Sequence, residues 1–362
     1  MDQVAAIIPC FKCKAQILSV ISGIGSSVAQ IIVVDDHCPE ATGQFVKENC
    51  HDPRVHVLFH EMNLGVGGAM ITGYRYAKDH GATILVKLDG DGQMDPSIID
   101  RFINPILYRQ ADYTKGNRFH DIEGVRKMPT LRLIGNAGLS FFCKLSSGYW
   151  DVFDPNNGYT AMSSVLLNSL PLDKIAKRYF FESDMLFRLN LARAVVLDVP
   201  MMSVYGDEKS NLKILHISHE FALRHMLNFC KRIFYNYFLR NFSVASMHFV
   251  VGNLLLAFGG SFSCYWWIHS ARTGILTTAG TVMLGASPIL IGIQFVLSFL
   301  NYDMAAMPRR PLTLDLVSSG NRRVTVRDFK VASENPPDSA PGDALTDSRS
   351  VKNVKGQKRA RP

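Results

Sequence analysis

A short apolar run that stops at two aspartates separated by one glycine is the feature that most constrains this chain. The run is Leu85-Val-Lys-Leu, and Asp89-Gly-Asp91-Gly-Gln93 follows it directly. A buried strand that ends in this way presents carboxylates at its carboxyl end, where ligands bind in open α/β sheets. Asp89 and Asp91 alternate, so both can reach one hard cation. An isolated Asp-Gly-Asp-Gly is equally typical of an acidic turn, so the rest of the chain has to decide between the two.

Two earlier segments show the same pattern of an apolar run with an abrupt stop. Val4 to Pro9 ends in a proline, and Gln30 to Asp36 ends in two carboxylates. Both are typical of parallel strands that are buried on two faces. Helical patterns lie between and after them, at residues 15–24, 41–49 and 67–80. This alternation predicts an α/β fold with a doubly wound sheet, in which three strand ends meet at one edge.

Two long segments without a formal charge follow the α/β region. They run from Ser246 to Ile268 and from Gly274 to Asn301, and each exceeds the roughly 20 residues needed to cross a hydrocarbon core. The connection between them is short, so we expect a two-helix transmembrane hairpin. A buried helix pair in a soluble protein is the alternative, which two such long segments in one small chain disfavour.

Basic residues flank the two uncharged segments. Residues 219–241 interleave them with aromatic residues, a pattern typical of a helix that lies on an anionic membrane surface. The turn between the two segments holds only Arg272, so the positive-inside bias places both chain termini in the cytoplasm. The basic residues before the first segment are Arg224, His225, Lys231, Arg232 and Arg240, and those after the second include Arg309, Arg310, Arg322, Arg323 and Arg327.

Composition narrows the class of protein further. The net charge of +8 fits a membrane surface and phosphate ligands better than DNA, because no nucleic-acid motif accompanies it. Seven scattered cysteines, including the Cys10/Cys13 pair, favour a reducing compartment over a disulfide framework. The chain enters a strand at once, so no cleavable signal peptide is expected. We divide it into an α/β domain (1–215), juxtamembrane helices (216–244), two transmembrane helices (245–303) and a largely disordered tail (304–362).

Five motifs lie in register along the first third of the chain: Ile8-Pro9, Val34-Asp35-Asp36, Asn63 to Gly68, Asp89 to Pro96 and Gly116-Asn-Arg118. Together they resemble a known enzyme family. Their order and spacing are those of family-2 inverting glycosyltransferases with the GT-A fold, most similar to the polyprenyl-phosphate group of dolichol-phosphate mannose synthase and bactoprenol glucosyltransferase. The resemblance covers roughly residues 4 to 215. Phe11-Lys12-Cys13 departs from the usual Tyr-Asn-Glu, which leaves the donor sugar open.

The resemblance implies a fold and an activity. The fold is the GT-A doubly wound mixed sheet, a Rossmann-like nucleotide-diphospho-sugar transferase fold. The activity is that of a hexosyltransferase that moves a hexose from a nucleotide diphosphate sugar, of the UDP-glucose or GDP-mannose type, to a polyprenyl phosphate with inversion. Mg²⁺ or Mn²⁺ is the implied cofactor, with Asp89, Asp91 and Gln93 as oxygen ligands. We expect an integral protein of the bacterial inner membrane that contacts lipids, and its oligomeric state is left open.

The donor site is implied at the strand ends. Pro9 and one of Asp35 and Asp36 would contact the nucleoside, and which carboxylate does so stays open. Asp89 would contact the donor through the metal, and Arg118 is a fork-shaped donor suited to a phosphate, with a solvated surface arginine as the alternative. Asn63 to Gly68 opens a helix, where close packing is favoured over phosphate contact.

The acceptor side is implied in the middle of the chain. Asp154 begins a segment similar to the family's Asp-x-x-Ser-Gly-Phe-Arg, which makes it a catalytic candidate with Asp91. A polyprenyl phosphate is already largely anionic at neutral pH, so Asp154 either deprotonates or only orients it. Glu182 is a further sugar-binding candidate, and Asp184 is a catalytic and sugar-binding candidate at the better-matched position, although acids in a first helical turn also act as caps. Arg132 and Asn136 lie four residues apart on one helix, where relatives hold the lipid phosphate.

Two other functions remain open from the sequence. One is a transferase of the same fold that acts on a glycan or glycolipid, although the missing Gln-x-x-Arg-Trp element disfavours a processive polysaccharide synthase. The other is a catalytically silent membrane scaffold that only binds nucleotide. Intact Asp89 and Asp91 disfavour the scaffold.

Overall fold

A computed structural model describes residues 3–120, 130–202 and 214–314. For residues 130–134, 136 and 214–218 it describes the backbone alone. Of the expected tail (304–362), residues 304–314 are described and the rest lies outside the described residues.

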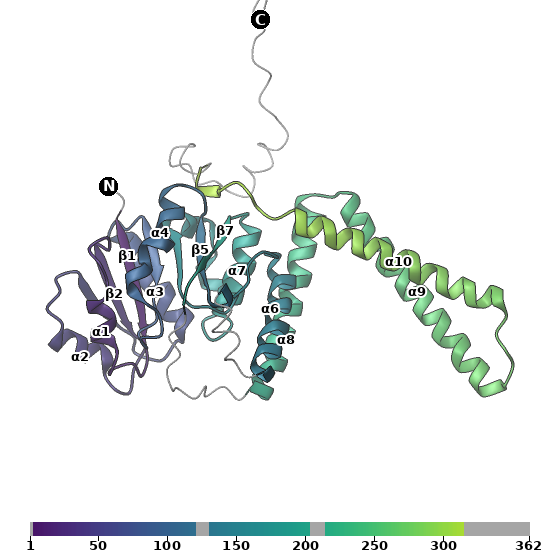
Figure 1. The fold of residues 1–362 in the computed structure, drawn as a ribbon, viewed down its shortest axis with the longest axis horizontal. Helices are drawn as coiled ribbons and strands as arrows, with labels where there is room; N and C mark the ends of the chain where they lie inside the picture. Colours follow the sequence, from purple (N-terminus) through teal and green to yellow (C-terminus); the bar gives the residue numbers. More distant parts are fainter. Residues whose placement is uncertain (1–2, 121–129, 203–213, 315–362) are drawn as a thin grey trace, which may run out of the picture. The chain divides into compact units, whose positions relative to one another are not determined.

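A seven-stranded mixed sheet forms the centre of the α/β domain (Figure 1). The strand order is β3-β2-β1-β4-β6-β5-β7. Strands β1 to β4 run parallel, β6 is antiparallel to both of its neighbours, and β7 is parallel to β5. This confirms the predicted mixed sheet. The strands are β1 (Val4–Cys10), β2 (Gln30–Asp35), β3 (Val55–Phe59), β4 (Ile84–Lys87), β5 (Tyr113–Asn117), β6 (Thr160–Ser163) and β7 (Val196–Pro200).

Helices cover both faces of this sheet, and each face has its own hydrophobic core. Alternate residues of β1 serve the two cores, because successive side chains of a strand point to opposite faces. Ala5 and Ile7 pack with residues of α3 and α7, whereas Ala6 and Ile8 pack with residues of α1 and α4. The predicted helices at 15–24, 41–49 and 67–80 are confirmed with small shifts of their ends. The helices are α1 (Ile17–Ser22), α2 (Thr42–Asn49), α3 (Val66–Asp79), α4 (Ile99–Leu107), α6 (Thr130–Ser147) and α7 (Phe181–Leu191).

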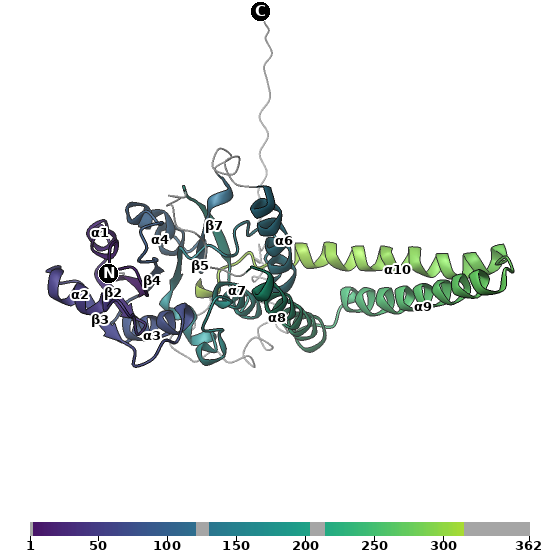
Figure 2. The same cartoon turned by 90° about the horizontal axis from the view of Figure 1, so that it is seen from below.

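Two long apolar helices, α9 (Val244–Thr273) and α10 (Ala279–Ala305), form the predicted hairpin. They lie side by side in both views (Figures 1 and 2). Glycines let the backbones approach closely, since a Cβ atom on Gly252 would lie 3.1 Å from the carbonyl oxygen of Gly292. Both helices are long and apolar enough to cross a membrane, and only 22% and 17% of their most apolar windows are buried. That exposure is unlike a core helix of a soluble protein.

Helix α8 (Ile214–Phe234) and the π-helical segment η5 (Tyr235–Arg240) precede the hairpin. Of the basic residues expected to face a membrane surface, Arg224 and Lys231 are exposed, whereas Arg232 and Arg240 turn inward. Arg232 is 1% exposed, and Arg240 donates a hydrogen bond to the Leu191 carbonyl at 2.6 Å. The Arg232 and Arg240 side chains thus have acceptors inside the protein, whereas several apolar side chains of α8 face outward. The exposed side of α8 carries Leu223, Met226, Leu227 and Phe234.

A buried carboxylate joins the hairpin to the α/β domain. Asp303 of α10 accepts two hydrogen bonds from Arg232, at 2.6 and 3.0 Å, and one from the Tyr237 hydroxyl at 2.6 Å. The indole N–H of Trp150 donates to the same carboxylate at 3.0 Å. Further along, Asp112 accepts the backbone N–H groups of residues 312 and 313, each at 2.8 Å. The chain on both sides of the hairpin is therefore fastened to the α/β domain.

His225 of α8 predicts a pH dependence of stability. Its ring is hydrogen-bonded to Ser146 at 2.8 Å and packs edge-on against Phe180, and burial lowers the pKa of His225 from 6.5 to about 4. Below about pH 6.5 the unfolded chain takes up a proton here that the folded chain does not, so stability falls as pH drops toward 4. We expect His225→Gln to remove about 2 to 3 kcal/mol of the stability difference between roughly pH 7.5 and pH 4.5.

Chemical denaturation at the two pH values measures this difference. His51→Gln is the control, because His51 is exposed and its replacement should leave the pH dependence unchanged. The same pH dependence in His225→Gln as in the unmodified protein would contradict the assignment.

Candidate active site

A buried lysine joins two carboxylates at the end of β4. Lys87 is the last residue of that strand and is 1% exposed. Its Nζ lies 2.7 Å from Oδ1 of Asp89 and 3.4 Å from Oε1 of Glu182, which stands in the first turn of α7. Burial alone lowers the pKa of Lys87, but attraction by Asp89 and Glu182 outweighs burial and raises that pKa above its ordinary value. Lys87 therefore stays charged beside the two carboxyl groups.

Glycines make room for this cluster. A Cβ atom on Gly158 would lie 2.5 Å from Oδ2 of Asp89 and 2.5 Å from Nζ of Lys87. In the loop after β4, Asp91 accepts the backbone N–H of Gln93 at 3.0 Å, so this segment does form a turn, which was the alternative interpretation of the sequence. The turn and the strand-end carboxylates therefore coexist in one loop.

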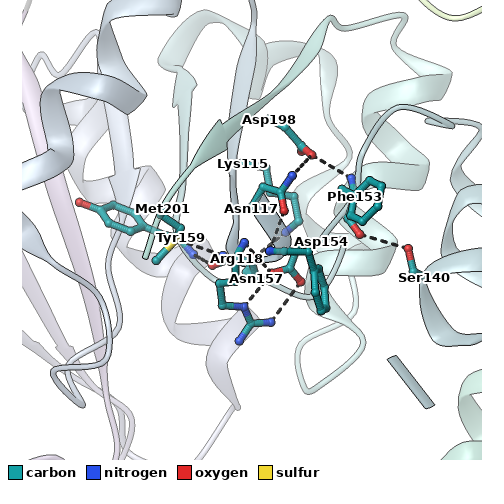
Figure 3. A network of polar contacts seen from close by, with 11 residues as sticks. Lys115, Asn117, Arg118, Ser140, Phe153, Asp154, Asn157, Tyr159, Asp198 and Met201 are labelled. Carbon is teal, nitrogen blue, oxygen red and sulfur yellow. Dashed lines mark hydrogen bonds and ion pairs between the residues drawn. The ribbon is translucent and has the colours of Figure 1, made fainter. Parts of the chain in front are cut away.

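Arg118 and Asp154 lie together at the end of β5 (Figure 3). The guanidinium donates from Nε to Oδ2 at 2.7 Å and from Nη2 to Oδ1 at 3.1 Å, and the carboxylate is 2% exposed. The sequence predicted these residues for the donor phosphate and for catalysis. The structure brings both to the same edge of the sheet, where they are bidentate partners of each other.

The turn that carries Asp154 is anchored from two strands (Figure 3). Lys115 of β5 donates to the Asn157 carbonyl at 2.5 Å. Asp198 of β7 accepts the Phe153 backbone N–H at 2.8 Å and the Asn117 amide at 3.1 Å. Burial raises the pKa of Asp198 to about 6. Sequence reasoning assigned no role to either anchor, because each depends on a partner more than 30 residues away.

Asp35 and Asp36 already have internal partners. Asp35 accepts the backbone N–H groups of Cys38 at 2.7 Å and Gly43 at 2.6 Å. Asp36 accepts those of Leu64 at 2.8 Å and Gly65 at 2.7 Å, and so fixes the glycine-rich turn. Close packing of that turn was the favoured interpretation, and the Gly67 N–H indeed donates to the Lys177 carbonyl at 2.8 Å. Pro9 is the penultimate residue of β1. It remains a prediction that Pro9, Asp35 or Asp36 contacts the nucleoside.

Asp184 does not belong to the Asp89 cluster. One of its oxygens accepts the Ala176 N–H at 2.9 Å and Nε of Arg188 at 3.0 Å, and the other accepts the Asn228 amide at 3.1 Å. Residues two apart on a helix point about 200° apart, so Glu182 and Asp184 cannot face one site. We therefore revise the preferred acidic residue from Asp184 to Glu182.

Arg132 and Asn136, the residues expected to hold the acceptor phosphate, belong to α6, but their side chains lie outside the described residues. Their role stays a prediction.

The loop after β4 fits a hard divalent cation. No three His, Cys, Asp or Glu side chains of the described residues are grouped as a metal cage. Mg²⁺ needs no such cage, because proteins hold it by one or two carboxylates together with substrate phosphates. Asp89 and Asp91 are both partly exposed and offer only oxygen, and the missing side chain of Gly158 leaves space beside Oδ2 of Asp89.

Comparisons with known proteins identify a family for this chain. The model of the family "Glycosyl transferase family 2" matches residues 5–170. The chain is 33% identical over 215 residues to UDP-N-acetylglucosamine--dolichyl-phosphate N-acetylglucosaminyltransferase of Methanococcus voltae, a match that covers 56% of this chain and 85% of the relative. It is 32% identical over 178 residues to undecaprenyl-phosphate mannosyltransferase of Micrococcus luteus, covering 49% and 72%. Polyprenol monophosphomannose synthase of Mycolicibacterium smegmatis is 28% identical over 200 residues, covering 54% and 75%.

The revised assignment of Asp184 predicts a structural effect. Asp184→Ala would leave Arg188, Asn228 and a backbone N–H without their acceptor, so we expect it to lower the free energy of unfolding by about 3 to 5 kcal/mol. Asp173→Ala is the control. The Asp173 carboxylate pairs with Arg75 at 2.7 Å but is 88% exposed, so its loss should cost at most about 1 kcal/mol. Urea denaturation in detergent measures both, and equal effects would show that Asp184 is no structural anchor.

Proposed function

The chain belongs to glycosyl transferase family 2 and is a glycosyltransferase, and we propose that it transfers a hexose from a nucleotide diphosphate sugar to a polyprenyl phosphate. The observation that carries this proposal is the meeting of the Lys87, Asp89 and Glu182 cluster with the Arg118 and Asp154 pair at one edge of the sheet. The relatives support the acceptor, because their names specify dolichyl phosphate and undecaprenyl phosphate. Those names differ in the sugar, so the donor stays open between the UDP-sugar and GDP-mannose types.

The donor would lie over the ends of β1, β2 and β4. Pro9 and the loop fixed by Asp35 and Asp36 border the nucleoside, and Asp89, Asp91 and Gln93 would hold Mg²⁺ or Mn²⁺. When bound, that cation neutralises charge that builds up on the leaving diphosphate. Glu182 is held at its position by Lys87 and would accept hydrogen bonds from the hydroxyl groups of the sugar.

The acceptor would approach from the side of β5. Its phosphate oxygen forms the new bond to the anomeric carbon while the bond from that carbon to the nucleotide diphosphate breaks, which inverts the configuration. The bond electrons leave with the diphosphate, and no proton has to move, because the phosphate is already anionic near neutral pH. Asp154 is buried and engaged with Arg118. We therefore assign Asp154 to orienting the Arg118 guanidinium toward phosphate oxygens of the donor, and not to deprotonation of the acceptor.

The helices after residue 214 would bring the site to its lipid substrate. We propose that α9 and α10 span the membrane and that the apolar side of α8 lies in its surface. The excess of basic residues outside the hairpin supports a cytoplasmic α/β domain, and the membrane that we propose is a bacterial inner membrane. Nucleotide sugars would then reach the site from the cytoplasm, and Arg132 and Asn136 of α6 remain our candidates for the acceptor phosphate.

A nucleotide-release assay tests the proposal. The purified protein in lipid nanodiscs receives UDP-glucose, UDP-N-acetylglucosamine or GDP-mannose with Mg²⁺ and either a polyprenyl phosphate or the matched polyprenyl alcohol. We expect release that needs one of these donors, the phosphate and the cation. Asp89→Asn should lower kcat/KM on the order of a hundredfold or more.

Asp95→Asn is the matched control, because Asp95 is exposed just after the loop and accepts the Ser97 N–H. It should keep activity within a few-fold of the unmodified protein. Equal release with the alcohol, or full release after complete chelation of metal, would contradict the proposed function.

A further inference from the structure

A row of polar side chains, three of them buried, crosses four strands beneath the candidate active site. In the strand register, Lys87 of β4 stands beside Thr160 of β6, Thr160 beside Lys115 of β5, and Lys115 beside Asp198 of β7. Side chains in register on neighbouring strands share one face of the sheet. Lys87 is 1% exposed and Lys115 is fully buried. Burying a lysine in a sheet core costs free energy unless the ammonium group has a partner. The partner of each lysine therefore indicates its role.

The two lysines have different partners. Lys115 donates to the neutral carbonyl of Asn157, and burial lowers the pKa of Lys115. Lys87 instead meets two carboxylates, those of Asp89 and Glu182. The Lys115 contact anchors the turn that carries Asp154. The Lys87 contact places a fixed positive charge directly against a proposed metal ligand.

The positive charge of Lys87 repels a metal ion that binds to Asp89. The Lys87 ammonium already occupies Oδ1 of Asp89 at 2.7 Å, so an incoming divalent cation has to share this carboxylate with a positive charge that cannot move into solvent. Repulsion between like charges a few ångströms apart is strong where water is excluded. A nucleotide diphosphate brings negative charges of its own, which offset the lysine. The cation is therefore held well only together with the diphosphate.

We propose that Lys87 is a positioning residue that weakens the binding of a divalent cation alone and so makes the cation bind, and leave, as a complex with the nucleotide diphosphate. This inference rests on the proposed metal-dependent function. Glu182 has the opposite effect, because it draws part of the Lys87 charge away from Asp89. The product nucleotide would then leave with its cation and empty the site for the next donor.

Titration with Mn²⁺, followed by electron paramagnetic resonance of the unbound ion, tests the inference without any turnover. The unmodified protein should bind Mn²⁺ weakly alone and much more tightly with UDP or GDP. Lys87→Gln keeps an N–H donor for Asp89 but removes the charge, so it should bind Mn²⁺ alone about tenfold more tightly and gain less from the nucleotide. Lys115→Gln is the matched control, buried in the same row without a contact to Asp89, and should bind Mn²⁺ as the unmodified protein does.

Two further variants keep the inference testable if Lys87→Gln does not fold. Lys87→Arg retains the charge and should bind Mn²⁺ as the unmodified protein does. Glu182→Gln removes one of the two carboxylates beside Lys87, so the lysine charge acts on Asp89 alone. This variant should bind Mn²⁺ several-fold more weakly. Unchanged or weaker Mn²⁺ binding in a folded Lys87→Gln, or tighter binding in Glu182→Gln, would overturn the role of Lys87 while leaving the proposed function intact. Failure of the unmodified protein to bind Mn²⁺ with either nucleotide would overturn the metal dependence and this inference with it.

Discussion

The charge of Lys87 is the constraint on which the rest of the site depends. A buried ammonium at the end of a central strand is tolerable only with anionic partners, and Asp89 and Glu182 supply them from two elements of the fold. This requirement brings the first turn of α7 to the end of β4. It also requires a residue without a side chain at position 158, because any Cβ there would collide with the ion pair. One buried charge thus sets the distance between a strand, a helix and the turn that carries Asp154.

A second buried ion pair, between Arg232 and Asp303, joins the hairpin to the α/β domain. Asp303 satisfies Arg232, Tyr237 and Trp150 at once, and these side chains come from α8, η5 and the loop after α6. Removing one partner would leave a buried charge without compensation, which costs far more than losing a surface pair. The apolar helices are therefore joined to the domain that holds the active site by a specific contact, as transfer to a lipid-borne phosphate would need.

The sequence predicted the parts of the fold that leave a local signal. Strands β1, β2 and β4 are apolar runs with abrupt stops, and α9 and α10 are long uncharged segments. Strands β6 and β7 were missed, because Thr-Ala-Met-Ser and Val-Leu-Asp-Val-Pro are short and interrupted by polar residues or proline. The roles of Lys87 and Arg232 were missed for another reason. Their partners Glu182 and Asp303 lie 95 and 71 residues further along the chain, and no periodicity reports such pairs. The choice between Glu182 and Asp184 depends on helical phase, which a motif match does not fix.

The configuration of the product tests the central claim most directly. An α-linked nucleotide sugar, labelled with carbon-13 at the anomeric carbon, is incubated with the protein and a polyprenyl phosphate, and the lipid product is analysed by NMR. We predict a sugar joined to the lipid through one phosphate, with carbon–phosphorus coupling at the anomeric carbon and the β configuration. A product that retains the α configuration, a sugar attached to a hydroxyl group, or free sugar as the main product would contradict inverting transfer to a lipid phosphate.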